Sequence, residues 1–477
     1  MDGPFTLTIE KSSTDRLYMH PETAAVYGIK ALETRTLKFG AATRIVQVEP
    51  DPNLDRRNLL RLSESLLHSM NIPLPPRYEI VSGDREIQVG PLIGMLVSGT
   101  EQGLRRRLRF LSRYTQHYPS INGVLLAFSL SGVNRKEKQV SGFYYHPEKK
   151  NWKRVTVPYP DSIFNMITLN DRWRSHFRNS LDRCLFNEYR FSKWEMYQAL
   201  KEHPETRDHL PETHLLASLC DLVPYLDSWD GIYIKPVAGS LGRSIYRIRK
   251  NGSGYSLSTS NRRGNFSIRL ANEKALLKSL KKHLDPEKTY LFQPLLRICY
   301  PGGIRDFRLI VVKDETGEWK DVGLIGRLGK RGAVVSSSIT GARREPGEAT
   351  IQSLVAEERD ADSVRKKMSE LALSAARIMD RKHHYGNFGM DLAMDQDGKL
   401  WLIEINSRDP HHYKAAKAGR KDLAREACRS NLAYAKRLAG FYRPEHSTSP
   451  SNPYRQDRSH ARTEGNPETI SAGTDVH

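Results

Sequence analysis

The feature that most constrains the fold is a pair of apolar segments in the last quarter of the chain. Residues 389–394 and 400–405 flank the turn sequence Asp395-Gln-Asp-Gly398. Apolar runs joined by a short Asp-Gly turn are typical of a β-hairpin, so the two segments are predicted to pair as antiparallel strands. Asp391 lies on the first strand and Glu404 on the second, so the hairpin brings two carboxylates onto neighbouring strands.

Glu404 stands between two isoleucines in an otherwise apolar strand. Asn406 follows two residues later, and residues two apart on a strand point to the same face. A buried carboxylate without a partner costs several kcal/mol, so a partner is expected. Two carboxylates and an amide oxygen are ligands of the kind that Mg²⁺ takes when it carries phosphates. The pattern predicts a magnesium site at Asp391, Glu404 and Asn406; the alternative is a polar network that closes the end of a sheet.

A second pattern follows the apolar run that ends in Lys235. The loop after it contains two glycines and two serines, in the sequence Pro236-Val-Ala-Gly239-Ser240-Leu-Gly242-Arg243-Ser244. Glycines let backbone N–H groups approach phosphate oxygens, and the lysine adds a point charge. The spacing is neither that of the P-loop nor G-x-G-x-x-G, and alone it also fits an ordinary hairpin. Followed 156 residues later by Asp391, it indicates a phosphate-binding loop.

The first 95 residues contain a weak internal repeat. Leu17 aligns with Leu60 and Gly40 with Gly83, at an offset of 43 residues. Each unit predicts a strand, a short helix and two short strands around a glycine turn. Two such units would form one small β-rich domain over residues 1–95 with an internal duplication, and chance similarity is the alternative.

The rest of the chain divides by pattern into three parts. Residues 96–185 show a strand–helix–strand order that predicts a parallel α/β unit. Residues 186–445 show α+β patterns and are expected to form two α+β lobes. They include a hairpin from Asp306 to Arg327 and an apolar helix face at Val364, Met368, Leu371, Ala375 and Ile378. Residues 446–477 are rich in Ser, Pro, Asn, Thr and Gly and have almost no large aliphatic residues, so a disordered tail is predicted.

The charge balance favours anionic partners. The chain has 75 Lys and Arg against 55 Asp and Glu, a formal net charge of +20 at pH 7. The pairs and runs Arg343-Arg344 and Arg105-Arg-Arg107 are expected on exposed faces, where they could bind an acidic substrate. No stretch of about 20 apolar residues is present, so no membrane-spanning helix is expected. The four cysteines form no C-x-x-C pair, which indicates a reducing, cytoplasmic compartment.

The order of these motifs resembles the ATP-grasp superfamily of ATP-dependent carboxylate–amine ligases, and more closely the YheC/YheD endospore-coat-associated family. The likeness extends over roughly residues 15–440. Its motifs are Leu60-Arg-Leu-Ser63, Gly90-Pro-Leu-Ile-Gly94, Val157-Pro-Tyr-Pro-Asp161 with Asn165, Phe186-Asn187, Lys193-Trp194, Leu210-Pro211 with Thr213, Lys235-Pro236, Asp306 with Arg308, Arg327, and Glu404-Ile-Asn-Ser407. The 13-residue step from Asp391 to Glu404 is typical of the superfamily, and the N-terminal motifs point to the narrower family.

The resemblance implies an ATP-grasp fold of two α+β lobes, preceded by the parallel α/β unit and the small β-rich domain. Mg-ATP would bind between the lobes. Lys193 and Lys235 would contact the α- and β-phosphates. The loop residues that would close over the phosphates are Gly239, Ser240, Gly242, Arg243 and Ser244.

The resemblance also implies roles at the other end of the site. Residues around Gln293 would meet the adenine through backbone groups. Arg327 would hold the γ-phosphate or the acyl phosphate made from it. Arg327 and Lys235 would be the two catalytic residues. The metal ligands would be Asp391, Glu404 and Asn406. This arrangement suits phosphoryl transfer, which needs positioning and charge neutralisation more than covalent chemistry.

The implied reaction is ATP-dependent ligation, in which a substrate carboxylate takes the γ-phosphate and an amine then displaces phosphate. One departure concerns the acceptor side, where relatives often carry Asn four residues before a Gly-Gly pair. Here Ser337 and Gly341-Ala342 take those positions. The alternative function is a non-catalytic spore-coat protein that retains the fold, and spore-coat proteins are candidate partners in either case. Nucleic-acid binding rests on charge alone, because the sequence shows no aromatic–basic recognition module.

Overall fold

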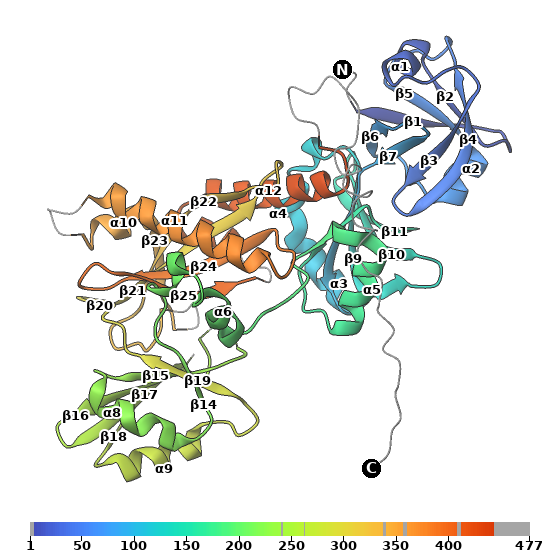
Figure 1. Ribbon diagram of the computed structural model, residues 1–477. Coiled ribbons are helices and arrows are strands. Elements are labelled where there is room, and N and C mark those ends of the chain that lie inside the picture. Colours follow the sequence, from blue (N-terminus) through green and yellow to red (C-terminus); the bar gives the residue numbers. More distant parts are fainter. Residues whose placement is uncertain are drawn as a thin grey trace, which may run out of the picture.

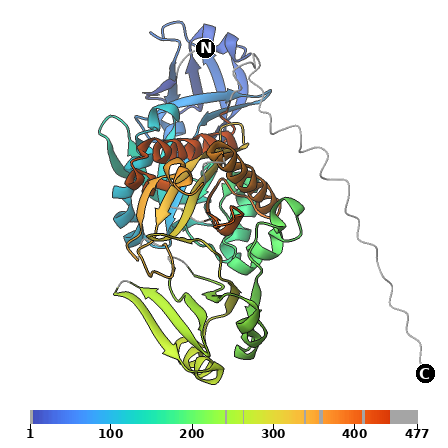
Figure 2. The same cartoon turned by 90° about the vertical axis from the view of Figure 1, so that its left-hand side faces the viewer.

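The structure, a computed structural model, describes residues 4–239, 242–261, 263–336, 340–355, 360–407 and 412–442. These residues form a closed β-barrel followed by three further sheets. Figures 1 and 2 show the barrel at one end of the molecule and the third sheet of the chain at the opposite end, with the other two sheets between them. The predicted tail at 446–477 lies outside the described residues.

The N-terminal barrel has the strand order β1-β5-β2-β4-β3-β7-β6 and closes through β1 and β6. The series β2-α1-β3-β4 recurs as β5-α2-β6-β7, and the two helix caps, His20 and Ser63, also stand 43 residues apart. This equivalence supports the proposal of an internal duplication. The elements are β1 Phe5–Glu10, β2 Arg16–Met19, α1 Pro21–Val26, β3 Glu33–Phe39, β4 Ala42–Pro50, β5 Leu59–Ser63, α2 Glu64–Met70, β6 Arg77–Ser82 and β7 Glu86–Gly90.

The second sheet is mixed rather than wholly parallel. Strands β9, β8, β12 and β13 are parallel neighbours, and β10 and β11 continue the sheet as an antiparallel hairpin. The expected boundary after residue 95 falls inside β8, which pairs in this sheet, so we place the boundary between β7 and β8. The elements are β8 Leu92–Ser98, α3 Glu101–Leu108, η1 Arg109–Leu111, α4 Ser112–Thr115, η2 Tyr118–Ser120, β9 Val124–Asn134, β10 Gln139–His146, β11 Asn151–Pro158, β12 Ser162–Asn165, α5 Asp171–Leu181, η3 Asp182–Cys184 and β13 Leu185–Phe186.

The third sheet is antiparallel, in the order β14-β19-β15-β16-β17-β18. Helices α8 and α9 cover one face, where Leu276 and Leu280 pack on Ile248 and Leu257. The elements of this part are α6 Lys193–Leu200, α7 Pro204–Arg207, β14 His214–Leu216, η4 Leu219–Leu222, α8 Val223–Ser228, β15 Ile232–Pro236, β16 Tyr246–Asn251, β17 Gly254–Asn261, β18 Gly264–Leu270, α9 Glu273–His283 and β19 Tyr290–Pro294.

The fourth sheet has the order β23-β22-β21-β24-β25 and contains both predicted hairpins. Residues alternate along β21: Phe307 and Leu309 pack with α11, whereas Ile310 and Val312 pack on the opposite face with α12. The elements are β20 Cys299–Tyr300, β21 Gly303–Lys313, β22 Trp319–Leu328, β23 Arg343–Pro346, α10 Gly347–Gln352, α11 Ala361–Asp380, β24 Asn387–Met394, β25 Leu400–Asn406, η5 His412–Ala418 and α12 Lys421–Leu438.

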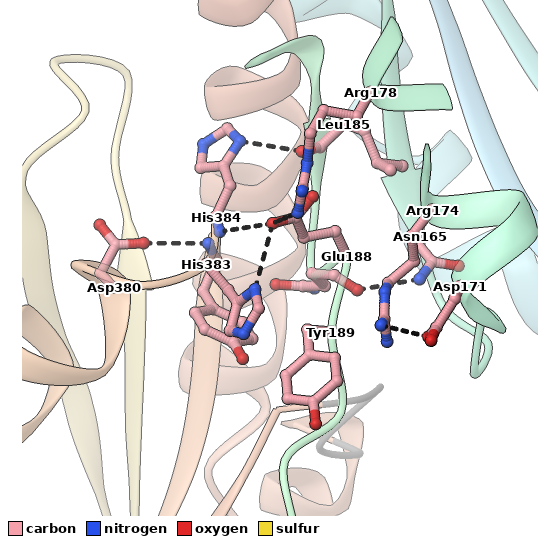
Figure 3. Close-up of polar contacts among 12 residues, drawn as sticks. Asn165, Asp171, Arg174, Arg178, Leu185, Glu188, Tyr189, Asp380, His383 and His384 are labelled. Carbon is pink, nitrogen blue, oxygen red and sulfur yellow. Dashed lines mark hydrogen bonds and ion pairs between the residues drawn. The ribbon is translucent and has the colours of Figure 1, made fainter. Parts of the chain in front are cut away.

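The segment between β13 and α6 ties the second sheet to the fourth. Figure 3 shows the Glu188 carboxylate facing Arg178 of α5 and the two histidines of the loop between α11 and β24. Glu188 is buried; it accepts a hydrogen bond from Arg178 Nη2 at 2.9 Å and one from the backbone N–H of His384 at 3.3 Å, and His383 Nδ1 lies 3.5 Å away. A paired and hydrogen-bonded carboxylate is a tolerable buried group, and here it joins two sheets.

Asn187, one residue earlier, makes the same connection through its backbone and side chain. Its φ of +57° places it in the left-handed region, which Asn tolerates better than most residues. Its N–H donates to His384 O at 2.9 Å, its Oδ1 accepts from Gly386 N at 3.0 Å, and its carbonyl accepts from Asn165 Nδ2 at 2.8 Å. The start of α6, six residues later, is thereby held against the fourth sheet.

Candidate functional site

A cavity of about 620 Å³ lies between the third and fourth sheets, beside the start of α6. Strands β15 and β19 supply one wall and strands β21, β22, β24 and β25 the other. Nine of the predicted site residues line this cavity: Lys193, Lys235, Gly239, Gly242, Gln293, Arg327, Asp391, Glu404 and Asn406. Residues from positions more than 200 apart in the chain therefore meet at one site.

The two lysines reach the cavity from different elements. Lys193 is the first residue of α6, whose start is capped by Ser192 and Glu195 in a reciprocal pair of hydrogen bonds. Lys193 Nζ lies 3.3 Å from Glu404 Oε1 and donates to Gly239 O at 3.4 Å. It therefore connects the glycine loop to the acidic strand β25.

Lys235 lies near the end of β15 and donates to Gln293 Oε1 at 2.7 Å. Gln293 in turn donates to Thr213 Oγ1 at 2.8 Å, so its side chain is fixed from both ends. Burial, partly opposed by Glu404 and assisted by Lys193, lowers the pKa of Lys235 to about 8. A cation held at this cost is suited to a site where an anion binds.

The glycine loop is only partly described. Gly239 and Gly242 line the cavity, and Gly242 has a φ of +71° that favours glycine. Arg243 and Ser244 are described but do not belong to the cavity lining. Ser240 lies outside the described residues, as does Ser337, the serine at the position where relatives often carry Asn.

Asp391 and Glu404 face each other on β24 and β25, as the Asp-Gly turn predicted. Asp391 is also opposite Arg308 of β21, and the two are ion-paired, with Arg308 Nε 2.5 Å from Asp391 Oδ1. Arg327 Nη1 lies 3.2 Å from Asp391 Oδ2. Burial would raise the pKa of Asp391, but Arg308 and Arg327 outweigh it and hold that pKa below its usual range.

Arg327 has a second carboxylate partner in Asp306. Its Nε lies 2.6 Å from Asp306 Oδ1, and Ser336 Oγ donates to the other oxygen of Asp306. Burial raises the pKa of Asp306 although Arg327 opposes the shift. The pKa of Arg327 is raised because Asp306 and Asp391 outweigh the effect of burial. Arg327 is thus a fixed cation in the cavity wall.

Asp306 and Arg308 had no predicted role, and Arg344 was predicted to lie on an exposed face. Arg343 is exposed, but the expectation is wrong for Arg344, which lines the cavity and is only partly exposed. Strand β23 pairs with β22 so that Arg344 lies opposite Arg327. Burial lowers the pKa of Arg344, and the nearby Arg327 and Arg308 lower it further. The pairing of distant strands, which the sequence does not show, brings these cations together.

The three predicted metal ligands are suited to a magnesium ion in their chemistry. Asp391, Glu404 and Asn406 all line the cavity. Asn406 Nδ2 donates to Gly389 O at 3.3 Å, which leaves its amide oxygen as the atom suited to a cation. Two carboxylates and an amide oxygen are the donors that Mg²⁺ prefers. Among the described residues, no group of three or more His, Cys, Asp and Glu is arranged to hold a metal.

The profile of the YheC/D-like ATP-grasp family matches residues 183–438. The chain belongs to the YheC/D-like ATP-grasp family. This match covers more than half of the chain and confirms both the resemblance and the ATP-grasp fold predicted from the sequence. It begins in η3 and ends with α12, so it contains the third and fourth sheets and all the cavity-lining residues except Thr168.

Two curated proteins of Bacillus subtilis (strain 168) are similar to this chain. Endospore coat-associated protein YheD is 24% identical over 419 residues, which cover 85% of this chain and 89% of YheD. Endospore coat-associated protein YheC is 22% identical over 315 residues, covering 63% of this chain and 82% of YheC. The YheD alignment therefore extends well beyond the family match, into the N-terminal part of the chain.

Solved ATP-grasp structures resemble the chain more distantly. The ATP-grasp ligase PsnB, complexed with a minimal precursor, has a TM-score of 0.43 and 11% identity, over 72% of this chain and 99% of that one. The D-cycloserine synthetase DcsG has a TM-score of 0.42 and 12% identity over the same shares. Among the described helices, none combines the length and apolarity needed to span a membrane.

Proposed function

We propose that the cavity binds Mg-ATP and that the chain is an ATP-dependent carboxylate–amine ligase associated with the endospore coat. The observation that carries the proposal is the convergence of Lys193, Lys235 and Arg327 with Asp391 and Glu404 on one cavity between two sheets. Cations to bind phosphates and oxygen ligands to hold a divalent ion are the two requirements of phosphoryl transfer. Family membership and the names of the curated relatives agree with this proposal.

Each side of the cavity suits one part of the nucleotide. Lys193 and Lys235 would bind the α- and β-phosphates, and the loop at Gly239 and Gly242 would offer backbone N–H groups to the same oxygens. The β19 end around Gln293, with Pro294 and Leu296 beside it in the lining, offers an apolar and backbone surface to the adenine. Arg327 would neutralise the γ-phosphate or the acyl phosphate.

Asp391, Glu404 and Asn406 would hold Mg²⁺, which when bound neutralises phosphate charge and orients the transfer. In the proposed reaction a substrate carboxylate oxygen attacks the γ-phosphorus, ADP leaves, and an amine attacks the acyl carbon and releases phosphate. Arg308 would act as a positioning residue, because it holds Asp391 from the side away from Arg327. The carboxylate and amine substrates both need space beside Arg327, where Arg344 and Ser407 also line the cavity.

The experiment is ADP release from Mg-ATP in the presence of pools of amino acids, peptides and spore metabolites. Sustained ADP release needs both a carboxylate and an amine, because without the amine the reaction stops at the acyl phosphate. Pools that supply both groups should therefore release more ADP than pools that lack one of them. The competing function is a coat protein that keeps the fold without the reaction. No ADP release with any pool, together with no binding of Mg-ATP by calorimetry, would leave that function as the explanation.

A further inference from the structure

The face of the third sheet that looks away from α9 carries arginine and serine side chains. Ile248 and Leu257 pack toward α9, so alternation places Arg247 and Arg249 on the opposite face. The hydrogen bond between Ser258 and Ser267, 3.0 Å long, shows that β18 follows the same alternation. The residues that share this Arg/Ser face are Arg247 and Arg249 of β16, Ser256 and Ser258 of β17, and Ser267 and Arg269 of β18.

The Arg/Ser face belongs to a segment whose charged residues are all basic. Residues 231–272 contain eight Lys or Arg and no Asp or Glu. Arg249 and Arg269 are exposed and lie in one row across the sheet, each opposite Ser256 in its strand pair. None of the Arg/Ser-face arginines forms an ion pair with any carboxylate of the described chain. By contrast, Lys250, which points the other way, is paired with Asp227.

The segment of the fourth sheet that meets this face is also free of carboxylates in its sequence. Residues 322–344 contain five Lys or Arg and no Asp or Glu. Its loop contacts the far end of the face, where Ser260 Oγ accepts from Val334 N at 2.9 Å and Asn265 Nδ2 donates to Arg331 O at 3.5 Å. Two acid-free segments from different sheets therefore border the same region.

The Arg/Ser face is continuous with the cavity. Tyr233 lines the cavity and lies opposite Arg247 in the β15–β16 pair. Ile245, just before β16, also lines the cavity. Arg269 lies three strands from Tyr233 and two residues along the strands. With strands about 4.8 Å apart and about 3.3 Å per residue, the two positions are about 16 Å apart, a distance that about five residues of extended chain would cover.

We propose that the Arg/Ser face binds an acidic chain, a peptide or similar polymer rich in carboxylates, that leads into the cavity as the acceptor substrate. This inference rests on the proposed function only for the statement that the bound chain is the substrate. Guanidinium groups pair with carboxylates through two parallel hydrogen bonds, and the intervening serine hydroxyls can donate to further oxygens. The face supplies three such arginines, and the segment that forms it, residues 246–270, contains no Asp or Glu.

Nucleic acid is a poorer match to the same face. Surfaces that bind single strands combine cations with aromatic side chains on which bases stack. The six residues of the Arg/Ser face include no aromatic residue. Tyr233, which adjoins them, is buried and donates its hydroxyl to Val334 O at 2.9 Å, and the exposed Phe266 of β18 belongs to the opposite face. A carboxylate chain needs no stacking partner, so it is the occupant that the side chains favour.

The test measures binding of a fluorescent oligo-glutamate peptide to the full-length protein by anisotropy. The perturbing variant is Arg249→Glu with Arg269→Glu. The matched control is Lys274→Glu with Lys278→Glu on α9, which has the same change of charge on the same lobe but on the other face. We expect the Arg variant to weaken binding about tenfold or more at low salt, and the control to change it by about twofold at most.

The melting shift with Mg-ATP is measured for the same proteins, because it reports on the cavity alone. We expect it to be unchanged in both variants. An unchanged affinity of the Arg variant for the peptide, an equal loss in the control variant, or no binding by the wild type would overturn the proposal. Tighter binding of a matched oligonucleotide that is lost in the Arg variant would overturn it in favour of nucleic acid. If the wild type binds the peptide but shows no binding of Mg-ATP, the proposed function is refuted and the Arg/Ser face remains a binding surface.

Discussion

Replacement of Lys235 by Met tests directly where phosphates bind. Met keeps the length and flexibility of the lysine side chain and removes its charge. Lys235 Nζ lies in the cavity wall, 2.7 Å from Gln293 Oε1, and its pKa of about 8 leaves it mostly charged at neutral pH. Without nucleotide, the loss of a buried cation and the loss of the partner of Gln293 act in opposite directions on stability. We therefore expect the free energy of unfolding to change by about 1 kcal/mol at most.

The effect on nucleotide binding should be much larger. A unit charge about 4 Å from a phosphate oxygen contributes about 4 kcal/mol at an effective dielectric constant of about 20. Lys193 lies in the same cavity and takes over part of this interaction, so we expect a loss of about 2–3 kcal/mol, or roughly 30- to 150-fold in Kd. Mg-ATP at about 100 times the wild-type Kd stabilises the wild type by about 2.7 kcal/mol. After a loss of about 100-fold the same concentration stabilises the variant by only about 0.4 kcal/mol.

The assay is thermal melting with and without Mg-ATP, with calorimetry to measure Kd. The matched control is Lys278→Met, because Lys278 is exposed on α9 and lies outside the cavity lining. The control should keep the full melting shift, whereas Lys235→Met should lose most of it. A Lys235→Met protein that retains the wild-type shift would refute the placement of the phosphates beside β15.

Three further predictions concern the other charged groups. Glu404→Gln should leave the melting temperature nearly unchanged, lower the rate of ADP release by orders of magnitude, and weaken Mg²⁺ binding more than adenosine binding. An equal Mg²⁺ affinity in the variant and the wild type would count against a metal at Glu404. Asp306→Ala should destabilise the protein by about 2–3 kcal/mol in urea unfolding, because it leaves Arg327 buried with Asp391 as its remaining carboxylate, and no loss would show that the pair is dispensable. Mg-ATP affinity should fall as pH rises above about 8, because the lowered pKa of Lys235 makes it lose its proton there rather than above pH 10. Titration calorimetry should find this pH dependence in the wild type and not in Lys235→Met.

Some features of the site could be predicted because they depend on one element at a time. The spacing of Glu404 and Asn406 put both on one face of β25, and the Asp-Gly turn put Asp391 opposite Glu404. The apolar steps Met368, Leu371 and Ala375 likewise predicted the buried face of α11. Backbone geometry within a strand, a hairpin or a helix sets these relations, and the sequence shows that geometry as a period.

Other features depended on which distant strands pair. Arg308 stands 83 residues before Asp391, and nothing local indicates that β21 lies beside β24. The sequence therefore presented Asp391 as a metal ligand and did not show the two arginines that balance its charge. The same limit made Arg344 look like an exposed residue, although its pairing opposite Arg327 places it at the cavity.

The sequence by itself determined the family, and it predicted the glycine loop and the candidate oxygen ligands, because each depends on residues close together or on a fixed motif. The tertiary structure decided the electrostatics of the cavity and the extent of the Arg/Ser face. Both arise when faces of strands far apart in the chain are buried against each other or left exposed together. The period of a single strand tells which residues share a face, but only the packing of the sheets tells what that face meets.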